Sequence, residues 1–131
     1  MTAKTGALIW AFVFIAVGAL GFIDNPIIGA SKTAMFHADT VHNWVHIISG
    51  ILFLLVALAA PGSARGFLIL FGIVYLALGV LGIIQFGTDG MGKLLGFFML
   101  MVPITICILA LVLLLHLQAC LPADIQIINQ A

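Results

Sequence analysis

The sequence predicts an all-α integral membrane protein that folds as a bundle of four transmembrane helices. Hydrophobic residues make up 65% of the 131-residue chain and charged residues only 6%, whereas about one quarter of a soluble globular domain is charged. A soluble domain of this length cannot bury so much apolar surface. Four long apolar segments, separated by short polar ones, therefore indicate a single domain whose solvent is lipid.

The four predicted spans cover residues 6–23, 41–60, 66–86 and 94–117, and a short C-terminal tail follows over 118–131. About 20 residues with a rise of 1.5 Å each are needed to cross the hydrocarbon core, and each segment is close to that length. Turn-forming or helix-breaking residues end each span: Asp24-Asn25-Pro26, Pro61-Gly62-Ser63, Gly87-Thr88-Asp89-Gly90 and Pro122.

Glycines are expected to shape the packing of these helices. Gly18 with Gly21, and Gly79 with Gly82, have the spacing that lets transmembrane helices approach closely. The segments 18–23 and 79–84 are also similar to each other, as in two duplicated helical hairpins, although chance similarity in a Gly-rich apolar chain explains them equally well.

Four crossings place both termini on the same side of the membrane. Lys4 and Arg65 lie on that side and Lys32 and Lys93 on the other. The count of basic residues is therefore equal on the two sides and does not show which side faces the cytoplasm. Because Lys4 and Arg65 flank spans directly, we expect the termini in the cytoplasm. The net charge of zero and the lack of a basic run exclude the surface typical of a nucleic-acid-binding protein.

Polar residues gather before and within the start of the second span. His42 and His46 are four residues apart and therefore share one face of a helix, and His37 and Asp39 lie just upstream. Imidazole and carboxylate groups bind divalent metals such as zinc or copper, so these four residues form a candidate metal site. In a second interpretation the histidines and Trp44 are interfacial anchors. Either Asp39 or Thr40 then caps the helix, and Asn43 forms hydrogen bonds to the turn at 24–25.

A cofactor held by His46 alone is a further possibility, because a haem or a chlorophyll-type pigment needs only one axial imidazole. A haem between two histidines of this chain is not expected, since the predicted fourth span would place His116 about 25 Å from His46 along the membrane normal. We find no catalytic residues: the chain lacks a phosphate-binding loop and a nucleophile with a neighbouring base. Polar residues within spans, such as Tyr75, are expected to bond neighbouring helices.

Two motifs of the chain are Gly21-Phe22-Ile23-Asp24-Asn25-Pro26 and His42-Asn43-Trp44-Val45-His46, and Gly50 follows the second. With these motifs the sequence resembles a family of small bacterial membrane proteins. That family has four spans, an His-Asn-x-Val-His motif opening the second helix, and no known function. The resemblance implies the four-span fold and a bacterial inner or photosynthetic membrane. A second family motif, Asp-Asn-x-x-His before the fourth span, is incomplete here, because residues 89–93 keep Asp89 but lack the Asn and His.

Two functions follow as expectations. The first is a non-catalytic accessory or scaffold subunit of a larger respiratory or photosynthetic membrane complex, with the lipid bilayer and other membrane subunits or further copies as partners. The alternation of apolar and polar residues over 125–128 would suit docking on such a partner. The alternative is a small metal- or pigment-binding membrane protein that uses the cluster at 37–46. A homo-oligomeric pore finds less support, because charged lumen residues are missing.

Overall fold

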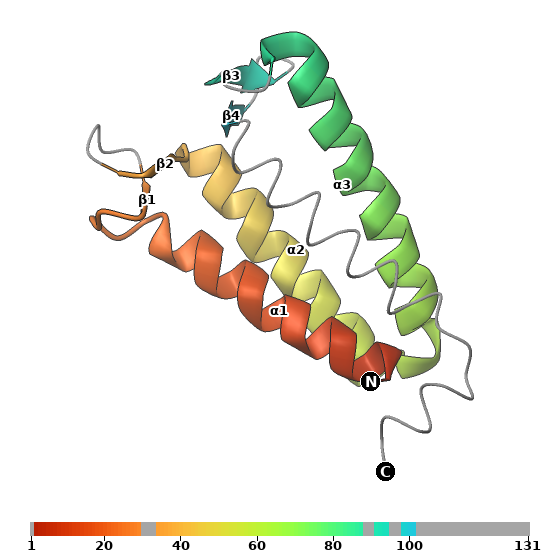
Figure 1. Cartoon of the computed structure of the whole chain (residues 1–131). Coiled ribbons are helices and arrows are strands. Elements are labelled where there is room, and N and C mark those ends of the chain that lie inside the picture. Colours follow the sequence, from red (N-terminus) through yellow and green to blue (C-terminus); the bar gives the residue numbers. More distant parts are fainter. Residues whose placement is uncertain (1, 30–33, 88–90, 95–97, 102–131) are drawn as a thin grey trace.

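The computed structural model describes residues 2–29, 34–87, 91–94 and 98–101, and most of them are helical (Figure 1). The elements in chain order are α1 (Ala3–Leu20), β1 (Ile28–Gly29), β2 (Phe36–His37), α2 (Thr40–Ala59), the 3-10 turn η1 (Pro61–Ser63), α3 (Ala64–Phe86), β3 (Met91–Leu94) and β4 (Phe98–Met101). The helices α1, α2 and α3 are each long and apolar enough to cross a membrane. They correspond to the first three predicted spans and indicate an integral membrane protein.

The fourth predicted span differs from the structure where the two can be compared. Leu94 lies in β3 and Phe98–Met101 form β4, which pairs antiparallel with β3. Hydropathy identifies an apolar segment but does not specify whether its backbone forms a helix or a strand. Residues 95–97 and 102–131, which make up the rest of the span and the tail, lie outside the described residues, so the fourth helix stays a prediction there.

Short polar or flexible residues define the ends of the helices. The Oγ1 atom of Thr2 accepts a hydrogen bond from the backbone N–H of Thr5 at 3.1 Å and so caps the start of α1. The helix α2 ends before Pro61, which cannot continue it. After α3, Gly87 has a φ of 73°, a conformation that glycine adopts without steric cost. These local signals explain why the helix boundaries lie close to the predicted ones.

Among the described helices, α1 and α2 are the closest pair, and they run antiparallel side by side (Figure 1). A Cβ atom on Gly18 would lie 2.7 Å from the backbone oxygen of Asn43, and one on Gly50 would lie 2.9 Å from the backbone oxygen of Ala11. Both distances are too short for a real side chain. Glycine on each helix therefore lets the two backbones come together, as predicted for Gly18.

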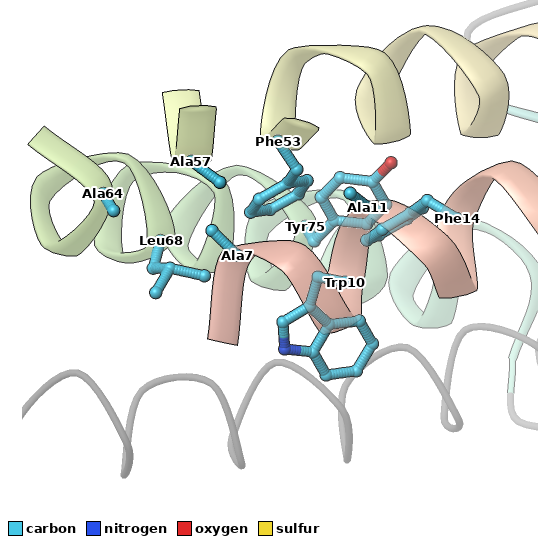
Figure 2. Packing of buried hydrophobic residues seen from close by; sticks show 9 residues of the cluster. All are labelled: Ala7, Trp10, Ala11, Phe14, Phe53, Ala57, Ala64, Leu68 and Tyr75. Carbon is cyan, nitrogen blue, oxygen red and sulfur yellow. The ribbon is translucent and has the colours of Figure 1, made fainter. Parts of the chain in front are cut away.

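A compact apolar cluster joins all three helices (Figure 2). Its buried members are Ala7, Trp10, Ala11, Phe14, Phe53, Ala57, Ala64, Leu68 and Tyr75. The ring of Phe14 lies at the centre, with its centroid 6.0 Å from that of Trp10, 5.6 Å from that of Phe53 and 5.3 Å from that of Tyr75. Aromatic pairs at these separations add to the stabilisation from burial, so Phe14 of α1 ties α2 and α3 together.

The connection from α1 to α2 is organised by the side chain of Asn25. Its Nδ2 atom donates to the backbone oxygens of Leu20, Ile23 and Ile28 at 2.8, 2.6 and 2.9 Å. Its Oδ1 atom accepts from the backbone N–H groups of Ile27 and Ile28, each at 2.9 Å. The amide thus supplies a partner to a carbonyl in the last turn of α1, which a helix end leaves unpaired, and turns the chain toward β1.

Candidate metal site

The inner face of α2 carries a row of polar side chains. His42, Asn43, His46 and Ser49 are the buried polar residues in the part of the chain that the structure describes. Positions 42, 46 and 49 share one helix face because they are three or four residues apart. Trp44, on a different face, is 52% exposed. The polar row therefore faces the interior of the protein and not the surrounding lipid.

His42 and His46 contact each other directly. Their Nε2 atoms are 3.0 Å apart, their ring centroids are 4.7 Å apart, and each residue is only 6% exposed. A neutral imidazole has one N–H donor and one bare nitrogen. One ring must therefore carry its proton on Nε2 while the other presents a bare Nε2 atom, so the two nitrogens share a single proton position.

The second ring nitrogen of His46 is unusual. Its Nδ1 atom is buried and has no hydrogen-bond partner among the described residues, while the ring stacks on Phe14 with centroids 5.2 Å apart and an interplanar angle of 30°. Leaving a buried polar atom unpaired costs about 1–3 kcal/mol. A buried polar atom of this kind calls for an explanation, such as an ion or a water molecule bound to it, and within the polar row it occurs in His46.

One turn further along α2, Ser49 connects the row to α3. The Oγ atom of Ser49 and the hydroxyl oxygen of Tyr75 form a buried hydrogen bond of 3.0 Å. This confirms the prediction that Tyr75 bonds a neighbouring helix. Sequence analysis did not single out Ser49 or Phe14 for the site. The only signal that pointed to them is helical spacing, since Ser49 lies three residues after His46 and Phe14 lies four residues after Trp10.

The predicted metal ligands are brought together only in part. Asp39 caps α2, since its Oδ1 atom accepts from the backbone N–H of His42 at 2.8 Å, as predicted. His37 lies in β2, where its backbone is paired in register with Gly29, and its side chain lies outside the description. Within the described residues, no group of three or more His, Cys, Asp or Glu side chains is placed to hold one metal ion. Of the four, His42 and His46 form the direct pair.

The tryptophan and the two histidines differ in exposure, and the interfacial interpretation stays a prediction. Trp44 is exposed and packs edge-on against Phe22, with centroids 5.4 Å apart, whereas His42 and His46 are directed inward. The predicted hydrogen bond from Asn43 to the turn at 24–25 is not found among the described side chains. Asn43 instead packs its side chain against Gly21.

Comparison with known proteins agrees with the sequence resemblance at the level of the family. No curated protein and no solved structure matches the chain. The profile of one protein family, described as a domain of unknown function (DUF4383), matches residues 4–118. This stretch contains α2, α3, the histidine pair and all of α1 except its first residue, Ala3. The chain therefore belongs to the DUF4383 family of domains of unknown function.

Proposed function

We propose that the protein is a non-catalytic integral membrane protein that binds one transition-metal ion between His42 and His46. The observation that supports this proposal is the contact of two buried imidazole Nε2 atoms at 3.0 Å inside an apolar bundle. Imidazole nitrogen is the commonest protein ligand for zinc and copper. Polar side chains directed into the interior of a membrane protein are costly and generally functional.

The spacing of the two nitrogens suits a metal ion. Two imidazole nitrogens bound to a tetrahedral ion at about 2.0–2.1 Å are about 3.3 Å apart. The observed 3.0 Å would have to increase by only about 0.3 Å, which small rotations of side chains on successive helical turns can provide. A metal ion would replace the single proton that the pair now shares.

A haem or pigment suits this arrangement less well. The Nε2 atom of His46, which would serve as the axial ligand, already lies 3.0 Å from His42, and the ring lies against Phe14. A macrocycle bound there would have to displace both neighbours, whereas a bare ion fits between the rings. His37 and Asp39 remain the predicted sources of further ligands on the N-terminal side of the pair.

The test is the metal content of the full chain purified in mild detergent. We expect one transition-metal ion per chain, lost in His42→Ala and in His46→Ala. His116→Ala is the matched control, because that histidine belongs to the predicted fourth span and not to the pair. Circular dichroism establishes that each variant remains helical. A metal content that is unchanged in both folded variants would contradict the proposal.

An accessory or scaffold subunit of a larger respiratory or photosynthetic membrane complex is the second candidate. It is favoured by large apolar side chains exposed outside the helices, since Ile27 is 53% and Met35 68% exposed in the connection between α1 and α2. Exposed apolar groups of this kind are typical of interaction sites. We expect the protein to copurify with a defined membrane partner, which the double variant Ile27→Ser/Met35→Ser should lose. A protein that stays monomeric in mild detergent without partners would exclude this role.

The location in a bacterial membrane and the cytoplasmic position of both termini also belong to the proposal. Single cysteines introduced at Thr2, Gly62 and Asp24 in a background lacking Cys107 and Cys120 would test the topology with a membrane-impermeant thiol reagent applied to whole cells. The topology predicts labelling at position 24 alone, because positions 2 and 62 lie on the opposite side. Labelling at position 2 or 62 in intact cells would contradict it.

A further inference from the structure

We propose that Ser49 is a positioning residue of the metal site, whose hydroxyl oxygen accepts a hydrogen bond from Nδ1 of His46 when the histidine pair holds an ion. The hydroxyl group of Tyr75 keeps Ser49 in place for this role. This inference rests on the proposed function and deepens it by assigning the partner of a metal ligand. It is carried by the chemistry of imidazole, by the unpaired atom of His46 and by the positions of the two hydroxyl groups.

Metal binding determines which nitrogen of His46 carries the proton. A neutral imidazole has one N–H group and one bare nitrogen, and a metal ion binds the bare one. With an ion held between the Nε2 atoms of the pair, the proton of His46 has to lie on Nδ1. A metal-bound histidine almost always donates this second N–H to a carboxylate, a carbonyl group or a water molecule. The site therefore needs an acceptor beside Nδ1 of His46.

The structure shows His46 before such an acceptor is in place. Its Nδ1 atom is buried and has no hydrogen-bond partner among the described residues. A buried N–H donor without a partner is costly, because it has lost its hydrogen bonds to water and gained none in the protein. Metal binding therefore requires an oxygen atom to approach Nδ1.

Ser49 is well placed to supply this oxygen. It lies three residues after His46 in α2, and each of the two residues is only 6% exposed. The Cβ atoms of helical neighbours at this spacing are about 5–6 Å apart, so a change of side-chain rotamer can bring the hydroxyl oxygen to Nδ1. A hydroxyl oxygen has two lone pairs, and Ser49 can accept from His46 while it keeps its bond to Tyr75.

Two other polar side chains of α2 and its cap are engaged elsewhere. The amide of Asn43 packs against Gly21 at the end of α1. Asp39 lies two turns before His46, where its Oδ1 atom accepts from the backbone N–H of His42. Both Asp39 and His42 take part in further interactions of their own. These contacts leave Ser49 as the side chain of the polar row that is assigned to Nδ1 of His46.

Tyr75 holds the Ser49 hydroxyl group from α3. The two oxygens form a buried hydrogen bond of 3.0 Å. The ring of Phe14 has its centroid 5.3 Å from that of Tyr75 and 5.2 Å from that of His46, and Figure 2 shows Phe14 beside Tyr75. The phenol and the imidazole therefore contact the same ring of α1, which places the hydroxyl pair in the region of the bundle where His46 lies.

The experiment measures Zn(II) binding to the full chain in mild detergent by competition with a chromophoric chelator. The variants are Ser49→Ala, which removes the acceptor, Ser49→Thr, which keeps it, and Tyr75→Phe, which removes only the second hydroxyl group. Phe53→Leu is the packing control, because its buried ring lies against Phe14 and has no hydrogen-bonding group. Nitrogen-15 spectra of the labelled imidazole rings in the Zn(II)-loaded protein report the Nδ1–H group of His46 directly.

We expect Ser49→Ala to weaken Zn(II) binding by about 10–100-fold, as is typical when the partner of a metal-bound histidine is removed. Ser49→Thr should bind nearly as well as the wild type, and Tyr75→Phe should be intermediate. Phe53→Leu should lower the thermal stability without changing the affinity for Zn(II). In the wild type, Nδ1 of His46 should carry a hydrogen-bonded proton whose nitrogen shift changes in Ser49→Ala.

Two results would separate this inference from the proposed function. Equal Zn(II) affinity in Ser49→Ala and the wild type, or the same Nδ1–H signal of His46 in both, overturns the role of Ser49 and leaves the histidine site intact. A wild type that contains no transition-metal ion and binds no Zn(II) overturns the proposed function together with the inference.

Discussion

The side chain of Asn43 occupies the space beside Gly21 in which any other residue would place its Cβ atom. Gly21 is the residue that follows α1, and Asn43 lies in the first turn of α2. The contact therefore brings the end of one helix against the start of the other. The contact helps to position both histidines, because Asn43 directly follows His42 and lies in the helical turn that leads to His46.

Replacement of Gly21 with alanine should separate the two helices. The new methyl group would collide with the Asn43 amide, and overpacking of this kind costs about 1–3 kcal/mol. The measurement is the free energy of unfolding in mixed detergent micelles. The matched control is Gly66→Ala in α3, because a Cβ atom there meets nothing within 4 Å. Equal stability of the two variants would show that α1 and α2 do not approach as described.

Asn25 should contribute more to stability than its exposed surroundings suggest. Asn25→Ala removes the donor to Leu20, Ile23 and Ile28 and the acceptor for Ile27 and Ile28. With about 0.5–1.5 kcal/mol for each net hydrogen bond and partial compensation by water, we expect a loss of about 2–3 kcal/mol. Asn25→Asp keeps the acceptor but not the donors and should be intermediate. An alanine variant as stable as the wild type would rule out this organising role.

Asp39 should affect the histidine pair through the helix start. Asp39→Ala removes the cap on the backbone N–H of His42, which costs about 0.5–2 kcal/mol and loosens the first turn of α2. Asp39→Ser restores a capping oxygen without a charge. Hydrogen exchange at residues 40–43 is the measurement, with faster exchange expected in the alanine variant and near-normal exchange in the serine variant. Equally fast exchange in both would point to a role of the charge instead of the cap.

Ser49 and Tyr75 should be energetically coupled. Ser49→Ala, Tyr75→Phe and the double variant form a thermodynamic cycle around their buried 3.0 Å hydrogen bond. Hydrogen bonds between membrane helices contribute about 0.6 kcal/mol on average and up to about 1.7 kcal/mol, so we expect a coupling energy in that range. Additive effects of the two substitutions would indicate that this bond does not link α2 to α3.

The metal-free histidine pair should have a defined tautomer. An orphaned N–H donor is less tolerated in a protein interior than an orphaned acceptor, and the buried Nδ1 atom of His46 has no described partner. His46 should therefore carry its proton on Nε2 and donate it to His42 across the 3.0 Å contact. Nitrogen-15 shifts of the labelled imidazole rings report this directly. A proton on Nδ1 of His46 in the metal-free protein would require an acceptor for it.

The sequence predicted the parts of this fold that depend on local properties. Hydropathy alone predicts the three long segments that form α1, α2 and α3, since lipid requires about 20 apolar residues for each crossing. The Asp39 cap and the shared face of His42 and His46 follow from helix periodicity. Leu94 and Phe98–Met101 were predicted as helix and form strands, because hydropathy identifies an apolar segment without specifying its backbone conformation.

Local patterns in the sequence predict a membrane protein with histidines one helical turn apart at the start of its second helix. Only the packing of the helices shows that these histidines face the interior, that their Nε2 atoms lie 3.0 Å apart, and that the ring of Phe14 stacks on that of His46. The physical reason is that helix periodicity relates residues within one helix. Which face of that helix is buried depends on how closely its neighbours pack, and here Gly18 and Gly50 set the approach of α1 to α2.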